Sequence, residues 1–429
     1  MPAEPADGDF TFVHAADLHL DAPLRGLTAT APEVAAALRD ASLEAFGSLV
    51  ELTMARGAAF LCLAGDIYDG AERGLRAQLA FRDGLERLSS AGISTFVVHG
   101  NHDPVEEGWS AVSAWPERTH FFSSEQVEAI EVRRGGAVLA TVQGISFAKR
   151  ETTENLALGF APRAGGGLQV GLLHCNVAGT ADGYASYSPC TLEELRSIGL
   201  DYWALGHIHE TRILSGRPGG LEPWIVYPGS LQARSRKASE AGAKGAMVVS
   251  VRGGRIAAVE HVACDRVRFS LAEVDLSGLS SLSELHSALV EEGHRLAEAA
   301  GGRSLVLRAR ITGRGEVHAE LARAGVLEQL TSALREEPVA AGRFCWWDRI
   351  EDRSSPPLDL EALSAGDDFT ADLLSVTAAA GQSIAASELF QKMPAELRKS
   401  AAGLVDELGL EAIFERSLLL ALDRLELGS

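Results

Sequence analysis

Five short apolar runs recur through the first half of the chain, and each is followed by polar residues. The runs cover residues 11–13, 60–63, 95–98, 170–173 and 202–205. They are rich in β-branched and aromatic residues, as buried strands are. The pattern predicts a layered α/β structure.

A different pattern begins near residue 266. Strand-like and helical segments alternate there and predict a small β-α-β-α-β unit; they cover residues 267–271, 283–299, 305–311, 318–334 and 343–347. Farther on, apolar residues recur at three- and four-residue intervals and predict a helical tail; they cover residues 371–380, 386–391 and 404–427. A chain of 429 residues is long enough for three domains, which we place at residues 1–265, 266–350 and 351–429.

Metal-binding residue types follow the predicted strands. They are Asp17, His19, Asp66, Asn101, His102, Asp103, His174, His207 and His209. Ligands collect at the carboxyl ends of strands in layered α/β structures, so these segments are expected to converge on one rim. Gly65, Gly100 and Gly206 stand where the backbone must turn sharply beside that rim.

The mixture of residue types suits phosphoester hydrolysis by two metal ions. Two divalent ions about 3.5–4 Å apart neutralise phosphoryl oxygens and activate a water molecule. A carboxylate can bridge such a pair, and Asp66 is the natural candidate. With Asp17 as the other anionic ligand, positive charge is left over for the substrate. Imidazole, carboxylate and amide donors together favour Mn²⁺.

The motifs resemble those of the calcineurin-like metallophosphoesterase superfamily. Within it they are similar to the SbcD-like DNA repair nucleases, closest to the YhaO-type branch. The resemblance rests on His14-Ala-Ala-Asp-Leu-His-Leu-Asp21, Tyr187-Ser-Pro-Cys-Thr-Leu-Glu-Glu-Leu195, Asp201-Tyr-Trp-Ala-Leu-Gly-His-Ile-His209 and Pro223-Trp-Ile-Val-Tyr-Pro-Gly-Ser-Leu-Gln232. It implies a four-layer αββα sandwich, with the α/β unit as a capping domain and a helical C-terminal tail.

The resemblance also implies a role for each site residue. One metal ion would bind Asp17, His19, Asp66 and His209, and the second Asp66, Asn101, His174 and His207. His102 would contact the phosphate as the general acid, and Asp103 would orient it. Asp69 is a departure, because some nucleases of the group carry a second phosphate-contacting histidine there.

The charge balance bears on a DNA substrate. The formal net charge is −20, whereas DNA binding draws on Lys and Arg at phosphates. Local charge decides binding, and basic residues follow or approach the motif segments. They are Lys149, Arg150, Arg212, Arg234, Arg236, Lys237 and Lys244. Any one of them alone is better explained as a solvated surface residue, whereas for the group a DNA-contacting role is equally consistent with the sequence.

Cellular location is predicted to be the cytoplasm. Five widely spaced cysteines form no C-x-x-C pair and indicate a reducing compartment. The acidic, polar N-terminus does not resemble a targeting segment, and no apolar run reaches the ~18 residues that a membrane span needs.

Three functions remain open at this point. The first is an Mn-dependent DNA exonuclease, with endonuclease activity as an extension, in DNA repair. The second is a phosphodiesterase for a small nucleotide or another non-polymer substrate, and the third is a non-catalytic scaffold. The resemblance favours the first and implies an SMC-like ATPase partner of the SbcC or YhaN kind, docked on the helical tail. It allows a homodimer, although no helical stripe identifies such an interface; the tail could equally pack on the body.

Overall fold

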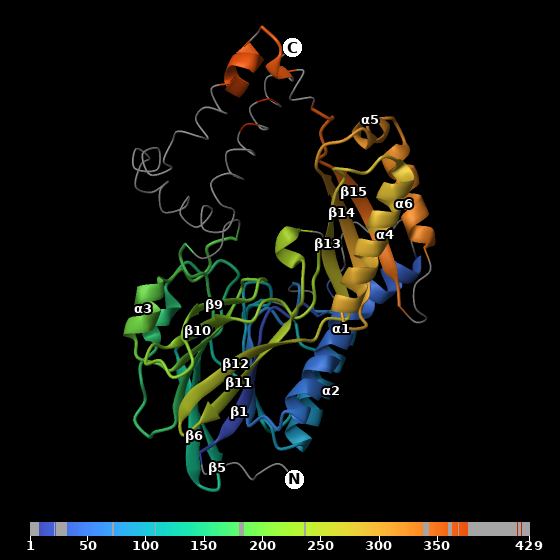
Figure 1. Ribbon diagram of the computed structural model, residues 1–429. Helices are drawn as coiled ribbons and strands as arrows, with labels where there is room; N and C mark the ends of the chain where they lie inside the picture. The colour runs from blue at the N-terminus through green and yellow to red at the C-terminus, as the bar shows by residue number, and fades with distance from the viewer. Residues whose placement is uncertain are drawn as a thin grey trace.

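The computed structural model describes residues 8–20, 22, 32–70, 73–107, 109–179, 184–235, 237–337, 343–358, 363–367, 369–375, 418 and 422. Two six-stranded sheets form the body (Figure 1). The first has the order β12 (Arg255–Ala263), β11 (Gly245–Arg252), β1 (Phe10–Ala15), β2 (Phe60–Ala64), β3 (Ser94–Val98) and β4 (Thr119–Phe121). Strands β1 to β4 run parallel, and β11 and β12 are antiparallel additions.

The second sheet also has a parallel centre. Its order is β5 (Glu128–Arg134), β6 (Ala137–Gly144), β7 (Leu168–His174), β8 (Tyr202–Gly206), β10 (Trp224–Tyr227) and β9 (Arg212–Ser215). Strands β6, β7, β8 and β10 are parallel, and β5 and β9 pair antiparallel at the edges. All five apolar runs of the sequence therefore lie in central strands, as predicted.

A single apolar core lies between the two sheets. It includes Phe12 and Phe60 from the first sheet and Val170 and Tyr202 from the second, all fully buried. The rings of Phe12 and Tyr202 meet edge to face with centroids 5.2 Å apart. Burial on both faces explains why these strands read as continuous apolar runs.

Helices cover the outer face of each sheet. Helices α1 (Pro32–Ala55) and α2 (Leu75–Ser90) pack on the first sheet, and η1 (Leu156–Gly159) and α3 (Leu192–Ser197) pack on the second (Figure 1). Thr191 begins α3 with a capping box that includes Glu194. The body thus has four layers, αββα, and the predicted α/β fold class is confirmed.

A second α/β unit follows the body. Its parallel sheet has the order β13 (Val267–Asp275), β14 (Ser304–Thr312) and β15 (Cys345–Asp352). One face packs against α4 (Leu282–Ala299), α5 (Val317–Leu321) and α6 (Val326–Glu336). The other face packs against the first half of α1, where Val34 and Leu38 contact Phe269 and Val306.

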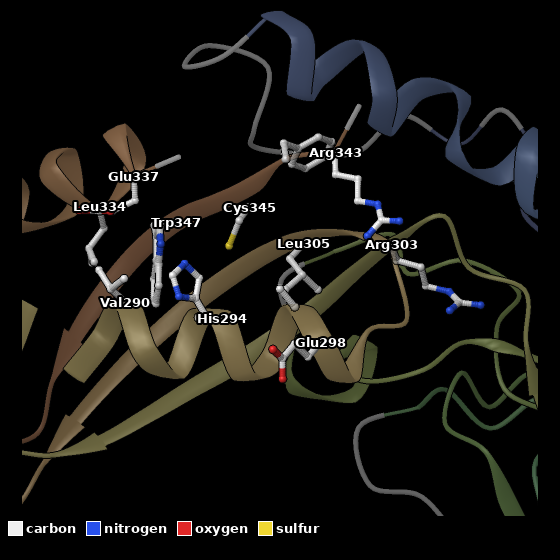
Figure 2. A pocket seen from close by; sticks show the side chains of 13 residues that line it. Val290, His294, Glu298, Arg303, Leu305, Leu334, Glu337, Arg343, Cys345 and Trp347 are labelled. Carbon is white, nitrogen blue, oxygen red and sulfur yellow. The ribbon is translucent and has the colours of Figure 1, made fainter. Parts of the chain in front are cut away.

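A cavity of about 250 Å³ opens on the helical side of this sheet (Figure 2). Its wall is largely apolar and includes Val290, Leu305 and Trp347. Glu298 and Arg343 stand at its edge. None of the nine predicted site residues lines this cavity; the chemistry lies elsewhere.

The predicted tail helices over residues 371–380, 386–391 and 404–427 lie outside the described residues, apart from 371–375, 418 and 422. Among the described helices, none is long and apolar enough to cross a membrane.

Candidate metal centre

The predicted ligands lie in loops that are hydrogen-bonded to one another. The amide of Asp17 donates to the carbonyl of Gly65 at 3.1 Å, and the amide of His19 donates to the carbonyl of Asp66 at 3.0 Å. The loops after β1 and β2 therefore continue side by side beyond the sheet. This arrangement fixes Asp17 and His19 relative to Asp66.

The backbone is strained where ligands occur. Asp17, His19, Asp66 and His207 have positive φ values of 51°, 43°, 51° and 100°, and Ser188 is the remaining non-glycine example in the described part of the chain. Such conformations are costly for non-glycine residues and persist where the surroundings enforce them. Four predicted ligands share this property, which marks the rim as a functional site.

Two glycines allow the strands to meet at this rim. A Cβ atom on Gly206 would overlap the carbonyl oxygen of Ala64, and one on Gly100 would overlap the carboxylate of Asp66. Glycine is thus required at these two positions because neighbouring backbone and side-chain atoms approach too closely for a Cβ atom, and the glycines themselves provide no ligand.

The first group of ligands brings together residues from two distant segments. Asp17, His19 and His209 offer donor atoms that all lie within 4.8 Å of one another. The Nε2 atoms of His19 and His209 are 3.3 Å apart. The carboxylate of Asp17 also accepts the amide of His207, at 3.1 and 3.0 Å to its two oxygens.

The second group shows that the donors fit a cation. The Nδ1–H of His174 donates to the carbonyl of Ala64 at 2.9 Å, so Nε2 carries a lone pair. That Nε2 lies 3.0 Å from Oδ1 of Asn101 and 3.6 Å from Oδ2 of Asp66. Three electron-rich atoms face one another without a hydrogen between them. A divalent ion among them would turn this repulsion into coordination.

Each of three histidines is held through its second ring nitrogen. Besides His174, Nε2 of His207 donates to the carbonyl of Ala185 at 2.8 Å, and Nδ1 of His209 donates to the carboxylate of Glu240 at 2.8 Å. Such contacts fix the tautomer and ring orientation of metal-binding histidines. Sequence reasoning missed Glu240, although it is the single acidic residue between positions 228 and 244.

Burial sets the protonation of the ligands. It lowers the pKa of His174 and of His207 to about 4, so both rings are neutral near pH 7. Burial raises the pKa of Asp66 to about 6, and burial together with the charge of Asp66 raises the pKa of Asp17 well above its usual range. Buried carboxylates this close together need compensating positive charge.

The geometry assigns His102 and Asp103 different surroundings from those expected. The ring of His102 lies at the cleft, with its Nδ1 3.3 Å from the carbonyl oxygen of Asp69. Asp103 is fully buried and accepts amide hydrogens from Gly100 at 2.9 Å and Ile67 at 3.0 Å. Its carboxylate also lies 3.2 Å from Nδ1 of His99. Asp103 therefore ties the ligand loops together, and Asp69 is the residue beside the His102 ring.

An open cleft of about 800 Å³ lies over these residues. Its lining includes Asp66, Asn101, His102, His207 and His209 from the predicted set. Tyr184 and Tyr187 also line it, and their rings lie 5.7 and 5.5 Å from that of His207.

The predicted basic residues differ in their surroundings. Arg150, Arg234 and Lys237 line the cleft. Lys244 is instead buried, and its Nζ donates to the carbonyls of His209 and Ser239 at 2.7 and 2.9 Å. Outside that lining, Lys149 pairs with Glu106 and Arg212 pairs with Glu210; Arg236 lies outside the described residues.

The cysteines form no disulfide in the structure. All five are free thiols, and Cys175, which follows a ligand directly, is fully buried. Its Sγ lies 3.8 Å from that of Cys190. Cys175 thus packs as a small apolar residue, in line with the sequence-based interpretation.

Comparison with known proteins agrees with this geometry. Residues 10–211 match the calcineurin-like phosphoesterase family, and residues 269–355 match the middle domain of metallophosphoesterase YhaO. The chain is 32% identical over 355 residues to an uncharacterized metallophosphoesterase, YhaO, of Bacillus subtilis (strain 168). That similarity covers 83% of this chain and 84% of the relative. The chain belongs to the calcineurin-like metallophosphoesterase family.

Membership confirms the resemblance drawn from the motifs and makes this metallophosphoesterase a metal-dependent phosphoester hydrolase. Its matched region, residues 10–211, contains all nine predicted site residues. The family binds divalent metal ions, and the clustered His and Asp donors of this chain fit them.

Proposed function

We propose that this metallophosphoesterase is an Mn-dependent DNA nuclease of the cytoplasm. It would act as an exonuclease, and also as an endonuclease, in DNA repair together with an SMC-like ATPase of the SbcC or YhaN kind. The proposal is supported by the site residues and by the shape of the surface around them.

The observation that supports a polymeric substrate is that the cleft over the metal centre and a neighbouring groove are both lined by the same lysine. Lys237 lines the cleft over the metal centre and also a second groove of about 170 Å³. The second groove lies on the face of the cap sheet that α1 partly covers and includes Arg308 and Arg310. Asp348 also lines it, and Arg310 pairs with Glu273 and Glu351. A mononucleotide would occupy only the cleft, whereas a strand could extend along both. Basic side chains on such a path suit successive phosphates.

In the proposed hydrolysis, separate residues would bind the metal ions, donate a proton and hold the ligand loops. When bound, two divalent ions supply positive charge for the phosphoryl oxygens and activate water. Asp17, His19, Asp66 and His209 would hold one ion, and Asp66, Asn101, His174 and His207 the other. His102 is 27% exposed at the cleft and would give a proton to the leaving oxygen. Asp103 would keep the ligand loops in register.

Manganese is proposed from the chemistry of the donors. Imidazole nitrogens outnumber carboxylates among the seven ligands, which disfavours Mg²⁺. Carboxylate and amide oxygens suit Mn²⁺ alongside those nitrogens. Metal analysis of protein purified without added metal, followed by activity titration with Mn²⁺, Mg²⁺ and Zn²⁺, tests this assignment.

The second candidate is a phosphodiesterase for a small nucleotide. The net charge of −20 favours it, because long polyanions are repelled by an acidic protein. Complete metal ligands and an accessible His102 weigh against a third reading as a non-catalytic scaffold. A DNA-tethering ATPase would compensate for weak intrinsic DNA binding. The tail proposed to dock that ATPase lies mostly outside the described residues.

A nuclease assay tests the proposal. Purified protein with Mn²⁺ should degrade linear double-stranded or single-stranded DNA, and His102→Ala should abolish this while metal content stays unchanged. The assay is repeated with the ATPase, which should increase the rate. Hydrolysis of a chromogenic diester without cleavage of any polymer, at any protein concentration, would support the second candidate instead.

A further inference from the structure

Asp69 lies among three polar side chains beside the metal centre. Its carboxylate forms an ion pair with Nη1 of Arg234, and its Oδ1 lies 3.3 Å from Nδ1 of His19 and 3.5 Å from Nδ1 of His102. Its carbonyl oxygen lies 3.3 Å from that same His102 nitrogen. One residue therefore touches a predicted ligand, the predicted general acid and a cleft arginine.

Arg234 is fixed at its backbone as well as at its side chain. Its amide donates to Oε2 of Glu240 at 3.3 Å, and Oε1 of the same carboxylate accepts from His209. The loop that carries Arg234 is thus joined to a metal ligand. The amide of Ser230, earlier in this loop, donates to the carbonyl of His209 at 3.1 Å. Arg234 therefore cannot move freely relative to the metal centre.

The guanidinium of Arg234 retains hydrogen-bonding capacity. Its Nη1 is committed to Asp69, but its Nε–H is buried and lacks an acceptor among the described residues. The side chain is 22% exposed and lines the cleft. Arginine binds phosphate through several donors in a fixed planar fork and stays charged at any physiological pH. A buried donor without an acceptor is costly, and an anionic oxygen would satisfy it.

We propose that Arg234 binds a non-bridging oxygen of the substrate phosphate, and that Asp69 is a positioning residue that holds Arg234 and His102 toward the same point. This inference rests on the proposed hydrolysis at the metal centre. It gives a purpose to Asp69, which stands where some nucleases of the group carry a second phosphate-contacting histidine. Here the guanidinium of Arg234, held in place by Asp69, would be the positive group that contacts the phosphate.

The decisive experiment is chemical rescue of an arginine deletion in the Mn-loaded, full-length protein. Arg234→Ala should lower kcat/KM for a chromogenic diester and for single-stranded DNA by about 100-fold, the usual effect of losing one donor to the reacting group. Millimolar guanidinium should restore part of this activity, and Arg234→Lys should restore less than the native arginine. Arg212→Ala removes an arginine that pairs with Glu210 and serves as the matched control, with neither loss nor rescue.

Asp69 is tested by coupling. Asp69→Asn should lower kcat, and its effect should be smaller in an Arg234→Ala background than in the native protein, because part of that effect acts through the Arg234 interaction. Metal content is measured for every variant. Unaltered kcat and KM in Arg234→Ala would overturn the inference. Loss of bound Mn²⁺ in that variant, or additive effects in the double variant, would also overturn it by showing separate structural roles.

Phosphate binding separates this inference from the proposed function. Calorimetric titration of the Mn-loaded protein with inorganic phosphate should give an affinity that falls at least about tenfold in Arg234→Ala, as loss of a charge-assisted hydrogen bond implies. If native protein binds phosphate through Arg234 and hydrolyses a chromogenic diester but cleaves no DNA, the proposed nuclease function fails and the inference stands. If native protein cleaves DNA and phosphate affinity does not depend on Arg234, the inference fails and the proposed function stands.

Discussion

Glu240 accepts a hydrogen bond of 2.8 Å from Nδ1 of His209 and so fixes which ring nitrogen faces the metal centre. Glu240 is 4% exposed. Burial raises the pKa of Glu240, but the His209 hydrogen bond and the charges of Lys244 and Arg234 outweigh it and the net pKa is lowered. A charged Glu240 increases the basicity of His209 toward a cation.

Glu240→Gln should therefore weaken metal binding by about 10- to 100-fold, the usual cost of losing such a partner. The measurement is calorimetric titration of metal-free protein with Mn²⁺. Glu210→Gln is the matched control, because Glu210 pairs with Arg212 outside the metal centre. Equal Mn²⁺ affinities of native protein and Glu240→Gln would show that this hydrogen bond does not tune His209.

Asp103→Ala should destabilise the protein. The substitution leaves the buried amides of Gly100 and Ile67 without their acceptor, at a cost of about 3 kcal/mol in the free energy of unfolding. Urea unfolding of the metal-free protein, followed by circular dichroism, measures this. His102→Ala, at a partly exposed position, should cost less than about 1 kcal/mol. A stable Asp103→Ala that has lost activity would instead support the orienting role implied by the resemblance.

His14 should make the stability depend on pH. It is fully buried between the hydroxyl of Tyr202 at 3.1 Å and the carbonyl of Leu205 at 3.2 Å. Burial lowers its pKa from 6.5 to about 3. Below pH 6.5, His14 is therefore protonated in the unfolded chain but neutral in the folded protein. The free energy of unfolding falls as the pH falls from 6.5 toward 3.

The contribution of His14 approaches about 1.4 kcal/mol for each pH unit within that window. His14→Gln retains a donor for the Leu205 carbonyl but does not titrate. The slope of unfolding free energy against pH should be shallower in this variant by about that amount, measured with urea between pH 6 and pH 4.5. Identical slopes would mean that His14 is solvated or protonated in the folded protein.

Lys237→Glu should weaken binding to DNA more than hydrolysis of a small diester. Lys237 borders both grooves. A strand that runs from the cleft into the second groove would pass this side chain, whereas a small diester bound in the cleft would not depend on it. In a His102→Ala background, the slope of log Kd for single-stranded DNA against log salt concentration should fall by about one. Lys149→Glu, an exposed partner of Glu106 outside both grooves, is the control. Equal effects of the two variants would remove the support for a strand along this path.

Local sequence patterns predicted the strands and the ligand types well, for a physical reason. Central parallel strands are buried on both faces and are therefore apolar throughout, and ligands such as Asp66 and His174 stand directly at their ends. Asn101 and His102 follow β3 in the same way. At these residues, the position directly after an apolar run in the sequence is also the position at the strand end in the fold, so the sequence pattern locates the ligand.

The hydrogen-bond partners of Asp103 and Glu240 could not be predicted from local sequence patterns. Asp103 is adjacent to His102 in sequence, yet its carboxylate reaches Ile67 on another loop, because the turn after β3 directs it inward. Glu240 reaches His209 only because the loop after β10 folds back over the rim. Contacts between loops depend on their folded paths, which no spacing rule encodes.

Helix α1 packs on the cap sheet with Val34 and Leu38 and on the first sheet of the body with Phe46 and Leu49. Its 24 residues are continuous, and a helix of that length is a rigid rod of about 36 Å. A change in the position of the cap relative to the body would therefore have to break the packing of α1 on one of the two sheets. The same helix thus couples the capping unit mechanically to the sheet whose strand ends carry Asp17 and Asp66.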